Sequence, residues 1–213
     1  MTRRSATRPA RERLLTAAGE LFYESGIAAT GVDAVLGRAQ VSPATLYAHF
    51  AGKDGLVAAY LERRFETWQR TWDDVLAERT DPIDRLLSLF DAVTRFREQE
   101  GNRRGCAFLA AATELPADHP GQRWLRADSR LLTGRLRELA VAAGLDDPDE
   151  VAATLLMLYD GALSRFARTA ITAGPAGDDP AGRARRLAAT WLADHGAPGA
   201  VHPPTAARTG ERG

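Results

Sequence analysis

The 213-residue sequence is poor in cysteine and lysine and contains no long apolar stretch. Its single cysteine, Cys106, excludes an intrachain disulfide and any zinc or iron–sulfur site built from several cysteines. The longest uncharged apolar stretches, near 106–113 and 151–159, fall far short of the roughly 18 residues that span a bilayer. No apolar segment follows the N-terminal arginines, and acidic residues occur early. We therefore expect a cytoplasmic protein with no signal peptide and no membrane partner.

The sequence also lacks the usual signatures of catalysis and of metal binding. Its four histidines form no His-Glu-x-x-His pattern. Neither a Gly-x-Ser-x-Gly elbow nor a phosphate-binding loop occurs. The acidic cluster at 146–150 stands at an expected helix start, where carboxylates stabilise the helix dipole. The sequence therefore predicts no metal and no cofactor, and an all-α enzyme is only the least favoured alternative.

Charge is distributed unevenly along the chain, although the formal net charge is zero. Five of the first thirteen residues are arginine, opposed only by Glu12. We interpret residues 1–9 as a basic, flexible arm. Such an arm can bind phosphate groups even when the whole chain is neutral, or it can serve only as a solubilising tail.

The apolar residues recur every three or four positions, and no sustained period-two alternation is present. This pattern predicts an all-α fold with a helix-turn-helix domain over 10–52, a helical domain over 53–196 and a disordered tail over 197–213. Thr30 is expected to cap the second helix in a capping box with Asp33. Ser42 is expected to cap the third, with Pro43 in its first position. The later helices are expected at 53–79, 82–100, 106–115, 122–143, 148–172 and 180–195.

The segment from Thr30 to Phe50 reads TGVDAVLGRAQVSPATLYAHF and contains two short helices joined by a turn around Gln40. This spacing is typical of a helix-turn-helix unit. In such a unit the first helix holds the second rigidly enough to enter the major groove of DNA. Two short helices also occur in many helical proteins, so the spacing alone does not identify a DNA-binding protein.

Longer motifs make a family resemblance specific. Residues 10–63 resemble the N-terminal domain of the TetR family of one-component bacterial repressors. The motifs are LLTAAGELFYESG, then Thr30 and Val32, then VSPATLYAHFAGKDGLVAAYL. GCAFLAAATEL and LYDGA in the second half are also similar to many members. The family commonly has glycine at the position of Gln40, where glutamine costs roughly 1 kcal/mol if φ is positive.

The resemblance implies that the third helix enters the major groove and that Tyr47 and Lys53 contact phosphates. Both residues could instead be ordinary surface side chains, and His49 could touch a phosphate or edge the core. No arginine, asparagine or glutamine lies on the expected outward face, so DNA shape and flanking residues should contribute to specificity. The candidate DNA-binding residues are Arg3, Arg4, Thr30, Arg38, Gln40, Ser42, Pro43, Ala44, Thr45, Tyr47, His49 and Lys53.

The resemblance also implies an effector cavity between the fourth and eighth helices and a homodimer formed by the last two helices. Each residue proposed for these roles could equally fill the core, and we interpret Cys106 as a small buried residue rather than a redox sensor. The cavity candidates are Trp68, Trp72, Phe96, Cys106, Phe108, Trp124, Met157 and Tyr159. The dimer candidates are Leu156, Leu163, Phe166, Leu187 and Trp191.

Together these patterns predict a one-component transcriptional regulator, a repressor that binds a palindromic double-stranded operator as a homodimer. A small, largely apolar effector is expected to release it. The alternative is an all-helical activator or architectural DNA-binding protein without ligand release.

Overall fold

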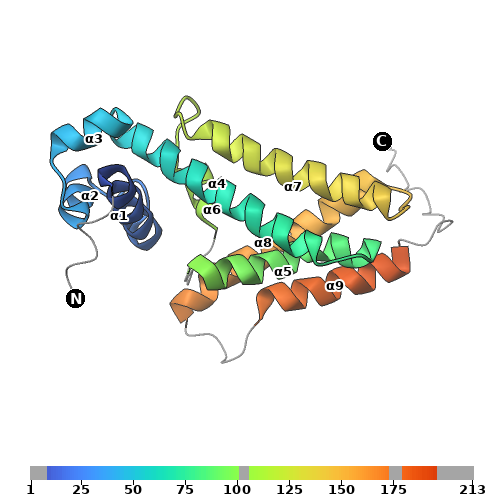
Figure 1. Cartoon of the computed structure of the whole chain (residues 1–213). Coiled ribbons are helices and arrows are strands. Elements are labelled where there is room, and N and C mark those ends of the chain that lie inside the picture. The colour runs from blue at the N-terminus through green and yellow to red at the C-terminus, as the bar shows by residue number, and fades with distance from the viewer. Residues whose placement is uncertain (1–8, 101–105, 173–178, 196–213) are drawn as a thin grey trace, which may run out of the picture.

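The computed structural model describes residues 9–100, 106–172 and 179–195, and within these ranges the chain forms nine α-helices and no strand (Figure 1). The expected all-α fold is thereby confirmed. Arg3, Arg4 and the expected tail over 197–213 lie outside the described residues. The helices are α1 Ala10–Ser25, α2 Val32–Ala39, α3 Pro43–Phe50, α4 Lys53–Ala77, α5 Pro82–Glu100, α6 Ala107–Glu114, α7 Gln122–Ala142, α8 Pro148–Thr172 and α9 Pro180–His195.

Local signals explain where most of these helices begin and end. Proline is the first residue of α3, α5, α8 and α9, where the missing N–H would have had no partner within the helix. Ser42 is the N-cap of α3, and its Oγ accepts a hydrogen bond from the Thr45 amide at 3.3 Å. α1 ends at Ser25, and the residue that caps it is Gly26. Gly26 has φ 88° and donates its amide to the carbonyl of Phe22.

The expected capping role of Thr30 is wrong. Gly31 occupies the N-cap position of α2, and no side chain caps this helix. The buried Thr30 hydroxyl instead donates to the carbonyls of Gly26 at 2.6 Å and Leu21 at 3.2 Å. Carbonyls at a helix C-terminus lack partners within the helix, so a nearby hydroxyl satisfies them. Thr30 therefore fixes the end of α1.

The long helix α4 connects two hydrophobic clusters and runs from the α1–α3 group to the far end of the molecule (Figure 1). Residues of its first half belong to one cluster with residues of α1, α2 and α3, and residues of its second half belong to the other cluster with residues of α5, α7, α8 and α9. The short helix α6 contributes Ala107, Phe108 and Ala111 to the cluster of the first group. α4 and α6 therefore share a hydrophobic cluster with the helix-turn-helix.

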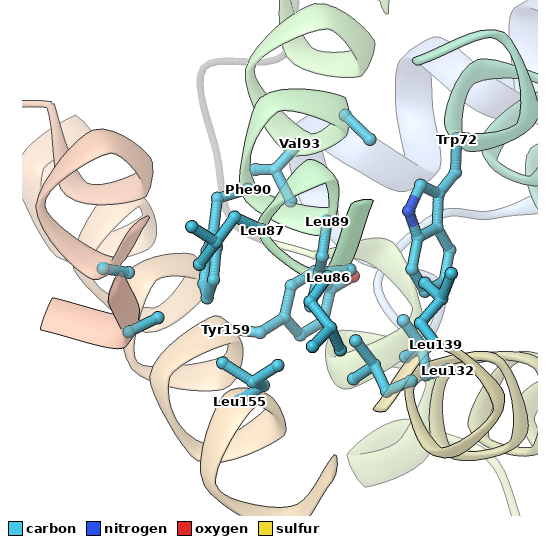
Figure 2. Packing of buried hydrophobic residues seen from close by; sticks show 14 of the residues in the cluster. Trp72, Leu86, Leu87, Leu89, Phe90, Val93, Leu132, Leu139, Leu155 and Tyr159 are labelled. Carbon is cyan, nitrogen blue, oxygen red and sulfur yellow. The ribbon is translucent and has the colours of Figure 1, made fainter. Parts of the chain in front are cut away.

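The second cluster is built around Trp72 and the apolar face of α5, with Leu132 and Leu139 of α7 and Leu155 of α8 close by (Figure 2). The Trp72 indole N–H donates to Ser88 Oγ at 3.0 Å, and Ser88 Oγ donates to the carbonyl of Arg85 at 2.6 Å. Since Trp72 is fully buried and its one polar group is satisfied, it is a core residue. It lines none of the cavities described below, although it was expected in the effector cavity.

Candidate functional site

One face of α3 is buried and the other is open to solvent. Leu46 and Phe50, four residues apart, pack into the first cluster. Ala44, Tyr47 and the neighbouring residues 48 and 49 are exposed, and Tyr47 keeps 62% of its surface. Thr45 is half-buried. The helix is therefore anchored through its inner face, and its outer face is open to solvent.

The N-terminal end of α3 gathers groups that suit a phosphate. Ser42 and Pro43 are exposed, and the Oγ atoms of Ser42 and Thr45 lie 2.9 Å apart. The first amides of a helix lack partners within it and point along a positive dipole end. Pro43 has no N–H, and the Thr45 amide already donates to Ser42 Oγ. The Ala44 amide and one of the two hydroxyls can therefore donate hydrogen bonds to a DNA phosphate next to the groove.

The turn between α2 and α3 is left-handed at Gln40, with φ 54° and ψ 53°. This conformation is the one that glycine adopts most readily, which explains the family preference noted above. The Gln40 carbonyl accepts a hydrogen bond from Arg13 of α1 at 3.2 Å. Arg38 forms a half-exposed ion pair with Glu20 at 2.7 Å. Both residues flank the outer face of α3, and both are tied to α1.

The joint between α3 and α4 is tight. A Cβ atom at Gly55 would collide with the carbonyl oxygen of Phe50, so only glycine lets α4 start this close to α3. The half-buried Lys53 donates its Nζ to the carbonyl of Ala28 at 3.4 Å. Because an ammonium has three donors, Lys53 keeps two for a phosphate.

Five of the eight expected cavity residues line one small cavity of about 30 Å³. They come from α4, α5, the start of α6 and α8, and they are Trp68, Phe96, Cys106, Phe108 and Tyr159. Larger cavities of about 230 Å³ and about 520 Å³ share Cys106 with it. The larger of these also borders the end of α1, so it lies between the helix-turn-helix group and the rest of the chain.

Two further expected cavity residues lie elsewhere, besides Trp72. Trp124 is half-buried and packs on Phe65 with ring centroids 5.6 Å apart, lining none of the described cavities. Met157 is 74% exposed on the outer face of α8. Its neighbour in sequence, Leu156, is half-buried and does line the 230 Å³ cavity. A helix turns by about 100° per residue, so adjacent side chains point to different sides.

The dimer candidates also differ in exposure, some lying at the surface and others inside the chain. Leu187 of α9 is 55% exposed, and Trp191 is half-buried on the same helix. Phe166 is half-buried beneath the guanidinium of Arg97, whose Cζ lies 3.7 Å from the ring centroid. Leu163, which was expected on a dimer surface, is buried and lines two cavities within the chain.

Sequence analysis missed the charged groups of the cavities. Asp128 of α7 is only 8% exposed, and burial, with the charge of Asp160 added, raises the pKa of its carboxyl to about 7. The signal was available, because position 128 falls on the apolar stripe of Leu125, Leu132 and Leu136. An acidic residue on such a stripe is either partnered or functional.

Arg64 and Cys106 also line these cavities. The buried guanidinium of Arg64 pairs with Glu100 at 3.4 Å and lies over the ring of Phe96, 5.1 Å from its centroid. Burial raises the pKa of the Cys106 thiol to about 11. The thiol is therefore protonated at neutral pH and a poor nucleophile, as expected of a structural cysteine.

Two contacts tie α6 and the loop before α7 to the N-terminal part of the chain. Glu114, the last residue of α6, accepts a hydrogen bond from the Ala28 amide in the α1–α2 loop at 2.6 Å. His119, in the loop before α7, places its Nε2 3.6 Å from a carboxylate oxygen of Asp54 at the start of α4.

Among the described helices, none is both long and apolar enough to cross a membrane.

Comparison with known proteins gives matches of two kinds: to part of the sequence, and to nearly the whole fold. The family model for bacterial regulatory proteins of the tetR family matches residues 14–60, which hold the helix-turn-helix. The HTH-type transcriptional activator FasR of Mycolicibacterium smegmatis is 36% identical over 90 residues, covering 42% of this chain and 41% of FasR. The chain therefore matches less than half the length of that relative.

Solved structures extend the similarity to nearly the whole chain. A TetR-family transcriptional regulator from Streptomyces coelicolor superposes with a TM-score of 0.75 at 28% identity, covering 88% of this chain and 96% of that one. A regulator from Streptomyces avermitilis gives 0.72 at 30% identity, covering 88% and 98%. Together with the outward-facing α3 and the all-helical fold of the described residues, these similarities establish that the chain belongs to the TetR family of DNA-binding transcriptional regulators, which are not enzymes.

Proposed function

We propose that the protein is a ligand-released repressor that binds a palindromic operator as a homodimer. The observation that carries the proposal is α3, whose inner residues Leu46 and Phe50 are buried while Tyr47 stands 62% exposed. A single helix-turn-helix makes few contacts with DNA, and a dimer doubles them. It then needs two half-sites about 34 Å apart, or a multiple of this distance.

At each half-site we assign phosphate contacts to both ends of α3. Ser42 and the Ala44 amide bind at its N-terminus, and Tyr47 and Lys53 bind near its C-terminus. Ala44 and the half-buried Thr45 meet base edges, where a methyl group can contact a thymine methyl. The outer face offers no bidentate donor, so the shape of the DNA and the flanking Arg38 and Gln40 supply much of the specificity.

The dimer surface that we propose is the outer face of α8 and α9. Two of the five large apolar side chains exposed in the described ranges, Met157 and Leu187, lie on these helices. Trp191 is half-buried on α9, the helix that carries Leu187. Light scattering on the purified chain tests this. Glutamate in place of Leu187 should yield a monomer, whereas glutamate in place of the exposed Val141 of α7 should leave the dimer intact.

The proposed release by an effector depends on the contacts that connect the cavities to the helix-turn-helix. The cavities border α6, α7 and α8, and α6 holds the α1–α2 loop through Glu114 and Ala28. A ligand that shifts α6 and the long α4 changes the spacing of the two recognition helices. Such a coupling is worth typically 1–3 kcal/mol and acts equally in both directions. Glu114→Gln should weaken the coupling, while Glu66→Gln on the exposed side of α4 should not.

A gel-shift with DNA flanking the protein's own gene is the experiment that tests the function. The wild-type chain should protect one short palindrome. Tyr47→Ala should lose at least tenfold in affinity, and Val141→Ala, which truncates another exposed apolar residue, should bind as wild type. Long unspecific coverage of the DNA would contradict the proposal and favour an architectural protein.

An activator is the second candidate, because FasR is an activator by name. Footprinting separates the two. An operator that overlaps the promoter blocks transcription, and one that lies upstream of it favours activation. A promoter fusion in the presence and absence of the protein gives the sign directly.

A further inference from the structure

We infer that the effector is a small organic cation, bound in the cavity between α6, α7 and α8 with its charged nitrogen beside Asp128 and Asp160. The inference rests on the proposed ligand-dependent function and names the chemical class of its ligand. The cavity has a volume of about 230 Å³, below the ~300 Å³ at which drug-sized pockets begin. The ligand is therefore small.

The first argument is the state of Asp128. Its side chain is 8% exposed and lines this cavity and the 30 Å³ cavity beside it. No hydrogen bond or ion pair partners its carboxyl among the described residues. Burying an unpaired charge is costly, so a buried carboxyl normally has a hydrogen-bonded or charged partner. Among the described residues, the space that Asp128 borders is these two cavities, and a partner can enter there.

The second argument is the charge around the cavity. Asp160 of α8 faces the same space, and its charge is one cause of the raised pKa of Asp128. Arginine and lysine are absent from the described lining of this cavity. Arg64 and Arg97 line the smaller adjoining cavity, and Arg64 is already paired with Glu100. A cation between the two aspartates would offset both the burial and the mutual repulsion.

The remaining lining suits an organic cation better than a metal ion. Most of the wall is apolar, from Leu125, Leu132, Leu156 and the rings of Phe108 and Tyr159. Calcium and magnesium take six or more oxygen ligands, whereas this cavity offers two carboxyls and the hydroxyls of Ser129 and Thr133 near its rim. Aromatic rings attract ammonium groups through their faces. A hydrocarbon body with an ammonium head matches both parts of the wall.

The test compares three probes of nearly equal size on the full chain by titration calorimetry at pH 8, where an alkylammonium keeps its proton. The probes are phenethylammonium, 2-phenylethanol and phenylacetate. We expect phenethylammonium to bind at least tenfold more tightly than the other two. Asp128→Asn should weaken it at least tenfold and change the affinity for 2-phenylethanol by less than threefold. Asp160→Asn should act in the same direction by about threefold, because Asp160 is exposed.

The matched control is Asp149→Asn, which removes one exposed carboxylate from the start of α8 and should leave all three affinities unchanged. Three outcomes would overturn the inference: no binding of phenethylammonium by the wild-type chain, equal or tighter binding of phenylacetate, or full affinity in Asp128→Asn. The probe comparison on the wild-type chain decides even if a variant misfolds. A gel-shift without any probe reports on the proposed function separately, so loss of operator binding there would contradict the regulator and not the ligand class.

Discussion

Replacing Asp128 with asparagine should make the protein more stable at neutral and alkaline pH. Asparagine has the shape of the protonated carboxyl and carries no charge to bury. Burial raises the pKa of Asp128 from its ordinary value of 3.8 to about 7. The folded state therefore keeps a proton that the unfolded state has lost. Stability must then fall as the pH rises between these two values, and the loss is complete above the folded pKa.

The size of the effect follows from the shift of about three pKa units. At about 1.4 kcal/mol per unit, the charge costs roughly 4 kcal/mol above pH 7. About half of this develops between pH 5.5 and pH 8.5. For a chain of this size, 4 kcal/mol corresponds to roughly 10 °C in Tm.

Thermal unfolding of wild type and Asp128→Asn at pH 5.5 and pH 8.5, at one protein concentration, measures the effect. The advantage of the variant should grow by about 2 kcal/mol between the two pH values. Asp149→Asn, whose carboxylate is largely exposed, should show no comparable growth. An advantage of equal size at both pH values, or a less stable variant at pH 8.5, would refute the burial argument.

Three further predictions concern a buried hydrogen bond, the backbone of the turn at residue 40 and the N-terminal arm. Ser88→Ala leaves the buried indole N–H of Trp72 without its partner and should lower the free energy of unfolding by about 1–3 kcal/mol in urea titration. Gln40→Gly relieves the left-handed backbone of the turn and should raise it by up to about 1 kcal/mol; a loss of stability would contradict this. Deleting residues 2–8 should weaken operator binding and flatten the dependence of log K on log salt, by about 0.9 for each phosphate contact removed. An unchanged salt slope would exclude the arm from the interface.

The cost of Asp128 has a bearing on function. A buried carboxyl without a partner is a feature that selection for stability alone would remove. Perturbed titratable groups in cavities are often functional. If asparagine stabilises the chain and abolishes cation binding, the two results together identify Asp128 as the counter-ion of the effector.

The sequence by itself determined the helices and the helix-turn-helix, because these depend on local signals. Proline at a first helical position, serine at an N-cap and apolar residues every three or four positions act within a few residues of each other. The backbone conformation of residue 40 also depends on local signals. Its left-handed φ agrees with the glycine that the family commonly has at this position. The all-α fold followed from the same signals, and the family resemblance followed from the longer motifs of residues 10–63.

Only the tertiary structure decided which apolar side chains border a space and which fill the core. Trp68 and Trp72 share one stripe of α4, yet Trp68 lines a cavity while Trp72 bonds to Ser88 of α5. Met157 reads as apolar in the sequence and stands exposed on α8. The hydroxyl of Thr30 turned back to α1 because open carbonyls lay there. Each outcome depends on neighbours brought together from distant parts of the chain, and local spacing carries no information about them.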